Sequence, residues 1–168
     1  MILVDTSVWV DYFNDYASLE ADFLTLCIAE ARPIVLAGLV LTEILQGVRD
    51  DVSARRVREV LSAFVLAPEL SRADYERAAE IYRVCRARGK TPRSAIDCLI
   101  AQLCLRNGYG LLSRDRDFGA IARCFELECI APPPEVREQA AHYHGGGLTA
   151  EPALTPPAAS AARRSSRA

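Results

Sequence analysis

The chain has 168 residues, of which 51% are hydrophobic and 25% charged, and its formal net charge is −2. This length and composition suit one globular domain with a substantial core, and they exclude a chain that is disordered throughout. The small net charge also excludes the strongly basic character of proteins that coat nucleic acids. The sequence has no apolar run of roughly eighteen residues and no signal-peptide pattern, so it predicts a soluble, cytoplasmic protein with no membrane partner.

The first half of the chain alternates short apolar runs with amphipathic segments. Residues 2–5 are too few for a helix and precede a helix-cap signal at Thr6 and Ser7, so they predict a strand that leads into a helix. The segment "PIVLA" at 33–37 predicts a second buried strand. Apolar side chains at helical spacing predict three further helices, at 18–31, 39–48 and 53–64.

The second half continues the alternation. A capping-box pattern at 71–74 and the apolar stripe after it predict a helix that ends at Gly89, and another helix is expected from about 92–94 to 107. Further strands are expected at 109–113 and 127–131, and short helices at 117–124 and between 134 and about 143. Strands that alternate with helices predict the α/β class, with a mostly parallel sheet covered by helices on both faces.

The composition changes near the "PPP" of residues 132–134. Residues 1–131 are expected to form the folded domain, and residues 132–144 a polar C-terminal extension. From 145 to 168 the chain is rich in Gly, Pro, Ala, Ser and Arg and has no periodic apolar pattern, which predicts a disordered tail.

Two aspartates follow predicted strands. Asp5 ends the first apolar run, and Asp115 follows the strand at 109–113, with Asp117 two residues later. The carboxyl ends of parallel strands are where α/β sheets bind ligands. The alternative for Asp115 is that it is a loop aspartate that caps the following helix, a role for which Asp117 is better placed.

Two further acids lie on apolar helices. Glu43 is the only charged residue in "LVLTEILQGV", and Asp97 lies in "SAIDCLIAQLCL", which is apolar nearly all round. Burying a carboxylate is costly unless it is paired or bound to a cation. Glu43 could instead face water at the edge of its helix, and Asp97 could be the third position of a capping box that begins at Ser94.

Taken together, the four acids suggest a metal site at one edge of the sheet. Carboxylates that lie close together raise each other's pKa and resist ionisation, and a divalent cation removes this repulsion. Oxygen ligands favour Mg²⁺ or Mn²⁺ over Zn²⁺. Such ions bind phosphates and activate water, so the predicted chemistry is metal-assisted hydrolysis of a phosphodiester.

Four stretches, "ILVDTSVWVD", "TEILQG", "DCLIAQL" and "LLSRDRDF", resemble in order and spacing the PIN-domain ribonucleases, and more closely their VapC-type toxin branch. The resemblance covers residues 1 to about 131. It implies an α/β/α sandwich, an endoribonuclease that uses Mg²⁺ or Mn²⁺, a homodimer, and neutralisation by a small antitoxin protein. Cys98 departs from the small residue usual in the family, and the tail after Gly145 has no counterpart.

Carried over by position, the resemblance implies that Asp5, Glu43, Asp97 and Asp115 are the catalytic and metal-binding acids. Thr6 or Ser7 would be the hydroxyl that orients a ligand or the scissile phosphate, and Asp117 a secondary contributor. The resemblance identifies neither the RNA sequence that is cut nor the number of metal ions.

Between Arg83 and Arg93 the segment "RVCRARGKTPR" contains five basic residues and no acid. Such a run is often a solvated helix end, but it also suits a patch that attracts phosphates. Because it directly precedes the helix of Asp97, we expect Arg86, Arg88, Lys90 and Arg93 to steer the RNA backbone towards the acids.

Other functions fit the sequence less well. A haloacid-dehalogenase-type phosphatase also begins with a strand that ends in Asp, but it needs a second Asp where this chain has Ser7. A nucleophilic enzyme with a histidine base is disfavoured because His142 and His144 are the only histidines and lie beside the glycine-rich tail. A housekeeping PIN nuclease and a non-catalytic interaction module remain open alternatives.

Overall fold

The structure is a computed structural model that describes residues 1–143. The predicted tail at 145–168 and His144 lie outside the described residues. Within the described part of the chain, strands and helices follow one another in the order β1 (Ile2–Val4), α1 (Thr6–Phe13), α2 (Leu19–Ala29), β2 (Ile34–Leu36), α3 (Gly38–Gly47), α4 (Asp51–Leu61), β3 (Val65–Leu66), α5 (Arg72–Ala87), α6 (Ala95–Asn107), β4 (Gly110–Leu112), α7 (Arg116–Ala122) and α8 (Val136–Ala141).

The four strands form one parallel sheet in the order β3-β2-β1-β4. Leu3 in β1 is in register with Val35 of β2 and Leu111 of β4. Side chains of β2 and β4 are buried on both faces of the sheet, which explains why these strands read as continuous apolar runs. The prediction of an α/β fold with a parallel sheet is confirmed.

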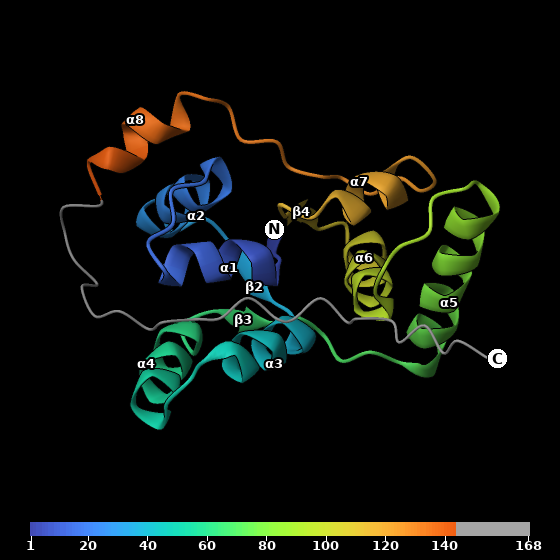
Figure 1. The fold of residues 1–168 in the computed structure, drawn as a ribbon, viewed down its shortest axis with the longest axis horizontal. Helices are drawn as coiled ribbons and strands as arrows, with labels where there is room; N and C mark the ends of the chain where they lie inside the picture. Colours follow the sequence, from blue (N-terminus) through green and yellow to red (C-terminus); the bar gives the residue numbers. More distant parts are fainter. Residues whose placement is uncertain (144–168) are drawn as a thin grey trace, which may run out of the picture.

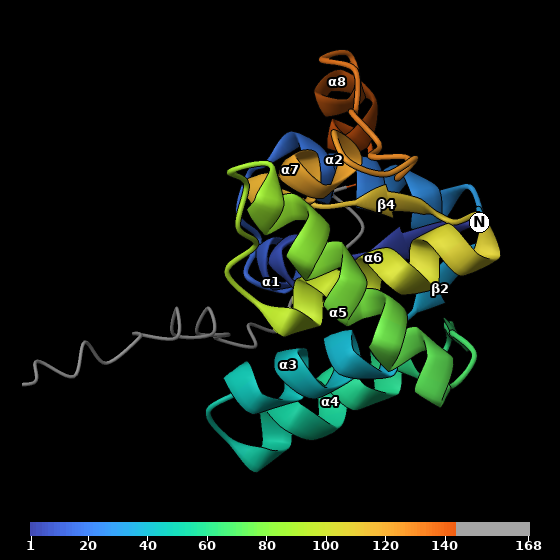
Figure 2. The same ribbon diagram turned by 90° about the vertical axis from the view of Figure 1, so that its right-hand side faces the viewer.

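Helices cover both faces of the sheet. Connections between parallel strands are right-handed, so the connections from β1 to β2 and on to β3 lie on one face, and the connection back to β4 lies on the other. Figure 1 shows α1, α2 and α4 on one side of the strands and α5 and α6 on the other. Turned by 90°, the molecule shows α5 and α6 packed next to each other (Figure 2). The three-layer α/β/α arrangement is confirmed.

The core lies between the sheet and these helices. Its largest fully buried side chain is Trp9 of α1, whose ring stacks on Phe13 with centroids 5.8 Å apart and meets Phe64 edge-on at 5.1 Å. On the other face, Ile100 of α6 is fully buried. None of the helices within residues 1–143 is long and apolar enough to span a bilayer.

Two strand predictions differ from the structure. The edge strand β3 was not predicted, because its two side chains, Val65 and Leu66, are 63% and 56% exposed and give no buried pattern. The strand predicted at 127–131 is wrong: Cys129 forms only an isolated parallel bridge with Leu111. The hydrogen-bond ladder between this segment and β4 cannot continue past Ile130. The next backbone N–H in the ladder would have to come from Pro132, which has none.

The predicted C-terminal extension packs on the folded body. Val136 and Ala140 of α8 are buried and form a small cluster with Leu26 of α2. Nε of Arg137 also lies 3.6 Å from Oδ2 of Asp22 in α2. Residues 132–143 therefore cover α2 and are less separate from the domain than their composition suggests.

Candidate metal-binding site

The fold brings four predicted acids to one edge of the sheet. Asp5 follows the last residue of β1, and Asp115 lies three residues after the end of β4, so both lie at the carboxyl ends of neighbouring strands. Helix α6 leads into β4 and runs back along the sheet, so its first turn, which carries Asp97, starts at this edge. Glu43 lies in α3, which begins directly after β2.

Asp5 is buried and caps α1. Its Oδ2 accepts hydrogen bonds from the backbone N–H of Ser7 at 3.2 Å, the Ser7 hydroxyl at 2.6 Å and the Ser113 hydroxyl at 2.9 Å. Burial raises the pKa of this carboxyl, and the hydroxyl groups partly offset the rise. The cap is therefore one residue earlier than the predicted signal at Thr6 and Ser7, because Thr6 is already helical whereas Asp5 keeps an extended backbone.

The two hydroxyls predicted beside Asp5 both contact carboxylates. Thr6 Oγ1 donates to Glu43 Oε2 at 2.5 Å, and this contact ties α1 to α3 across the top of the sheet. Ser7 bonds to Asp5 as described above. Thr6 and Ser7 thus orient acids in this structure. The role implied by the resemblance, in which one of them orients a ligand or the scissile phosphate, stays a prediction.

Asp115 and Asp117 lie at the start of α7. Asp115 is the N-cap, because its Oδ1 accepts the backbone N–H of Asp117 at 2.9 Å. The expectation that Asp117 is the better cap is wrong, since the Asp117 carboxylate instead accepts the backbone N–H of Arg93 at 2.7 Å and its Nε at 3.0 Å. Nη2 of Arg93 donates to both oxygens of Asp115, at 2.7 and 3.0 Å.

Asp97 is the acid of this cluster that has no hydrogen-bond partner within residues 1–143. No hydrogen bond to its carboxylate is found among residues 1–143, and Ser94 caps α6 through the backbone N–H of Ile96 at 3.0 Å without a capping box. Burial and, to a smaller extent, the negative charges of the other four acids of the site together raise the pKa of Asp97 to about 7. These four are Asp115, Asp5, Asp117 and Glu43. The acids therefore lie close enough to repel one another.

This donor set fits a hard divalent cation. Carboxylate and hydroxyl oxygens are the ligands that Mg²⁺ and Mn²⁺ prefer, and the unrelieved repulsion at Asp97 is the condition that a cation would remove. In their present orientations, no group of three or more His, Cys, Asp or Glu side chains within residues 1–143 is arranged to hold a metal ion. Hydroxyls and Arg93 hold four of the acids, so some of these side chains must turn to bind an ion together.

The raised pKa of Asp97 predicts how the stability of the metal-free protein changes with pH. In the unfolded chain this pKa returns to 3.8, so between about pH 4 and pH 7 the folded state binds the proton more tightly. We therefore expect the free energy of unfolding to fall as the pH rises through this range. Thermal melts in EDTA from about pH 4 to pH 8 measure the fall. Asp97→Asn should flatten it; an unchanged fall would assign the effect to other groups, such as the buried Asp5.

The predicted RNA-steering residues do not act as one group. Arg93 is turned onto Asp115 and Asp117, so its charge is already paired. The guanidinium of Arg86 lies over the Tyr82 ring at 5.8 Å. Nη1 of Arg88 lies 3.4 Å from the Cys124 carbonyl oxygen, and Lys90 is exposed. Steering by these residues stays a prediction, and of the four only Arg93 contacts the acid cluster within the described part of the chain.

Sequence analysis missed two residues beside the acids. Ser113 donates to Asp5, and its hydroxyl also accepts the backbone N–H of Asp115 at 3.0 Å, so it joins the two strand-end acids. Arg114 donates its backbone N–H to Ser7 Oγ at 3.2 Å, and its side chain pairs with the buried Asp11. Ser113 could have been found from the sequence, because it directly follows β4 just as Asp5 directly follows β1.

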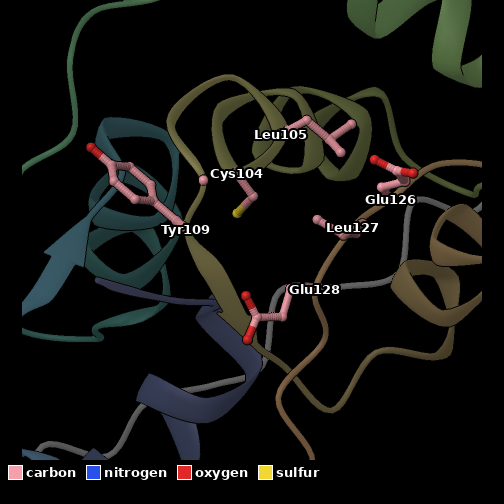
Figure 3. A pocket seen from close by; sticks show the side chains of 7 residues that line it. Cys104, Leu105, Tyr109, Glu126, Leu127 and Glu128 are labelled. Atoms are coloured by element: carbon pink, nitrogen blue, oxygen red, sulfur yellow. The ribbon is translucent and has the colours of Figure 1, made fainter.

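Other features of the structure lie away from the acids. The cavity in Figure 3 has a volume of about 100 Å³ and is lined by Tyr109, Glu126 and Glu128 near the amino end of β4, at the opposite edge of the sheet. His142 is exposed after α8, with Nδ1 3.1 Å from the Glu138 carbonyl oxygen. Within residues 1–143 no histidine therefore lies near the acids to serve as a catalytic base.

Sequence comparison connects this site with known proteins. The chain matches the PIN domain profile over residues 2–123. It is 38% identical over 132 residues to the VapC ribonuclease Mb1587 of Mycobacterium bovis, a match that covers 78% of this chain and 98% of the relative. Ribonuclease VapC11 of Mycobacterium tuberculosis matches with the same identity and coverage.

Solved structures share the fold at lower sequence identity. VapBC2 from Rickettsia felis, solved with a DNA fragment from its promoter, matches with a TM-score of 0.62 at 19% identity over 77% of this chain and 98% of that chain. VapC20 of Mycobacterium tuberculosis, a toxin that cleaves the sarcin-ricin loop, matches with a TM-score of 0.55 at 22% identity over 76% and 99%. At these identities the likeness supports the fold alone.

Proposed function

The chain belongs to the PIN-domain family, in its VapC ribonuclease branch, and on this premise we propose that it is an endoribonuclease that hydrolyses RNA phosphodiester bonds with a divalent cation. The observation that carries the proposal is the convergence of five carboxyl groups at one edge of the sheet, where the Asp97 carboxylate accepts no hydrogen bond from residues 1–143. A divalent cation would remove the repulsion between these like charges.

In this proposal Asp5, Glu43, Asp97 and Asp115 hold Mg²⁺, or Mn²⁺ in its place. When bound, such an ion supplies positive charge that attracts phosphate oxygens and makes water more acidic. The protein contributes orientation: the Ser7 hydroxyl fixes Asp5, and the Thr6 hydroxyl fixes Glu43. One of the four carboxylates accepts the proton of the attacking water.

We also propose that the protein is the toxin of a toxin–antitoxin pair. Its relatives at 38% identity are VapC ribonucleases, and structural neighbours include VapBC assemblies, in which a VapC protein is solved together with a VapB partner. On this basis a small antitoxin is expected to bind over the acid cluster and to block access of RNA. The resemblance to the VapC-type toxins also leads us to expect that the active protein is a homodimer.

The decisive test uses the purified chain without any partner protein and a set of structured RNAs. We expect cleavage in Mg²⁺, complete loss of cleavage in excess EDTA, and recovery when Mn²⁺ is added, because the acids alone repel the RNA phosphates. Mapping the new RNA ends then identifies the sequence that is cut. Cleavage that survives EDTA would rule out the proposed role of the cation.

A further inference from the structure

Arg93 occupies the acid cluster in a way that the proposed chemistry does not require. Its Nη2 donates to both oxygens of Asp115, and its Nε donates to Asp117. The Asp115 carboxylate also accepts the backbone N–H of Asp117 in the first turn of α7, so its acceptor positions are largely taken up by donors from the protein. A cation that binds Asp115 must therefore compete with a guanidinium that is already there.

The contact between Arg93 and Asp115 is of a kind that can be released. The Arg93 side chain is 69% exposed and Asp115 is 31% exposed, so water solvates both groups if they separate. The backbone of Arg93 stays anchored, because its N–H donates to Asp117, which is only 16% exposed. The side chain can therefore swing away without loss of the turn that leads into α6.

We propose that Arg93 is a built-in counter-cation: it neutralises Asp115 and Asp117 while the site lacks a metal, and it leaves Asp115 when a divalent cation binds. This inference rests on the proposed metal site and goes beyond it, because it states that Arg93 lowers the affinity of the site for the divalent cation. It also accounts for the absence of a ready-made metal-binding group within residues 1–143 although the acids converge there. Once released, the exposed guanidinium is free to meet an RNA phosphate.

The experiment compares Mn²⁺ binding to the purified wild-type chain and to Arg93→Gln, by electron paramagnetic resonance or titration calorimetry without RNA. Glutamine removes the competing charge but keeps the backbone N–H that bonds to Asp117. We expect Arg93→Gln to bind Mn²⁺ about fivefold more tightly or better, a coupling typical of two ligands that exclude each other. The matched control is Arg77→Gln, which removes a guanidinium that pairs with Glu80 on the exposed surface of α5 and should leave the affinity unchanged.

A second measurement separates competition from a purely structural role. If Arg93 competes with the ion, Arg93→Gln lowers the melting temperature in EDTA but not in saturating Mn²⁺, because the contact is absent from the metal-bound protein. An equal loss of stability under both conditions, an unchanged or weaker Mn²⁺ affinity, or no Mn²⁺ binding by either protein would overturn the inference. RNA cleavage is measured separately. If Arg93→Gln binds Mn²⁺ more tightly but the wild type cleaves no RNA, the inference about Arg93 stands and the proposed function is wrong.

Discussion

Asp97→Asn is expected to reduce RNA cleavage by at least about 100-fold, a loss of the size found when one group is removed from a preorganised active site. Asp97 is the one acid of the cluster whose carboxylate no other side chain within residues 1–143 holds in place, and asparagine removes its negative charge with little change in shape. The measurement is the single-turnover rate on a mapped RNA substrate. In cells, expression of the wild-type chain should arrest growth, and expression of Asp97→Asn should not.

Loss of activity in this variant should not come from unfolding. The charge of Asp97 is disfavoured by burial and by four neighbouring carboxylates, so its removal should leave the melting temperature in EDTA at pH 8 unchanged or higher. Glu59→Gln, on the exposed surface of α4, is the matched control and should cleave like the wild type. Full cleavage by Asp97→Asn would show that the proposed site is misplaced.

Trp9→Ala should lower the free energy of unfolding by about 3–5 kcal/mol, the usual cost of removing a large aromatic side chain from a core. Trp9 has no exposed surface and contacts the rings of Phe13 and Phe64. Because it lies in α1, one turn after the acid that caps this helix, its loss should also weaken Mn²⁺ binding. Urea unfolding with an unchanged m-value measures the loss of stability.

Two variants test whether packing explains this cost. Nε1 of Trp9 is buried and has no hydrogen-bond partner among the described residues, which by itself costs about 1–3 kcal/mol. Trp9→Phe removes this unpaired donor and keeps a ring, so it should stay within about 1.5 kcal/mol of the wild type. Tyr75→Ala, at an exposed aromatic position of α5, should have little effect. If Trp9→Phe is as unstable as Trp9→Ala, the indole itself is essential.

The predictable parts of the fold are those whose pattern follows from burial. β1, β2 and β4 are recognisable because buried parallel strands are apolar on both faces, and α5 because its capping box begins it, as the structure confirms. β3 could not be predicted, since an exposed edge strand of two residues has no periodicity. The segment at 127–131 has the composition of a strand. Pairing with β4 also requires backbone N–H donors from this segment, however, and Pro132 has none.

The position of the site could be predicted for a topological reason. Carboxyl ends of parallel strands and the starts of returning helices share one edge, so Asp5, Asp97 and Asp115 had to meet there once the sheet was assumed. The hydrogen bonds around them could not be predicted. Which of two aspartates caps α7, and the fact that Arg93 folds back onto the acids, depend on side-chain rotamers that no spacing rule specifies.

Two of the acids also hold helix ends: Asp5 caps α1 and Asp115 caps α7. Asparagine caps a helix about as well as aspartate, whereas alanine costs about 0.5–2 kcal/mol. Both replacements lie one base change from an aspartate codon, yet we expect them to leave different products: an asparagine mutant should be inactive but intact, whereas an alanine mutant should be more readily degraded. If the protein is a toxin, a variant with asparagine at either position would persist in the cell and bind the antitoxin without cleaving RNA. It would thereby change the amount of active toxin that is needed for an effect.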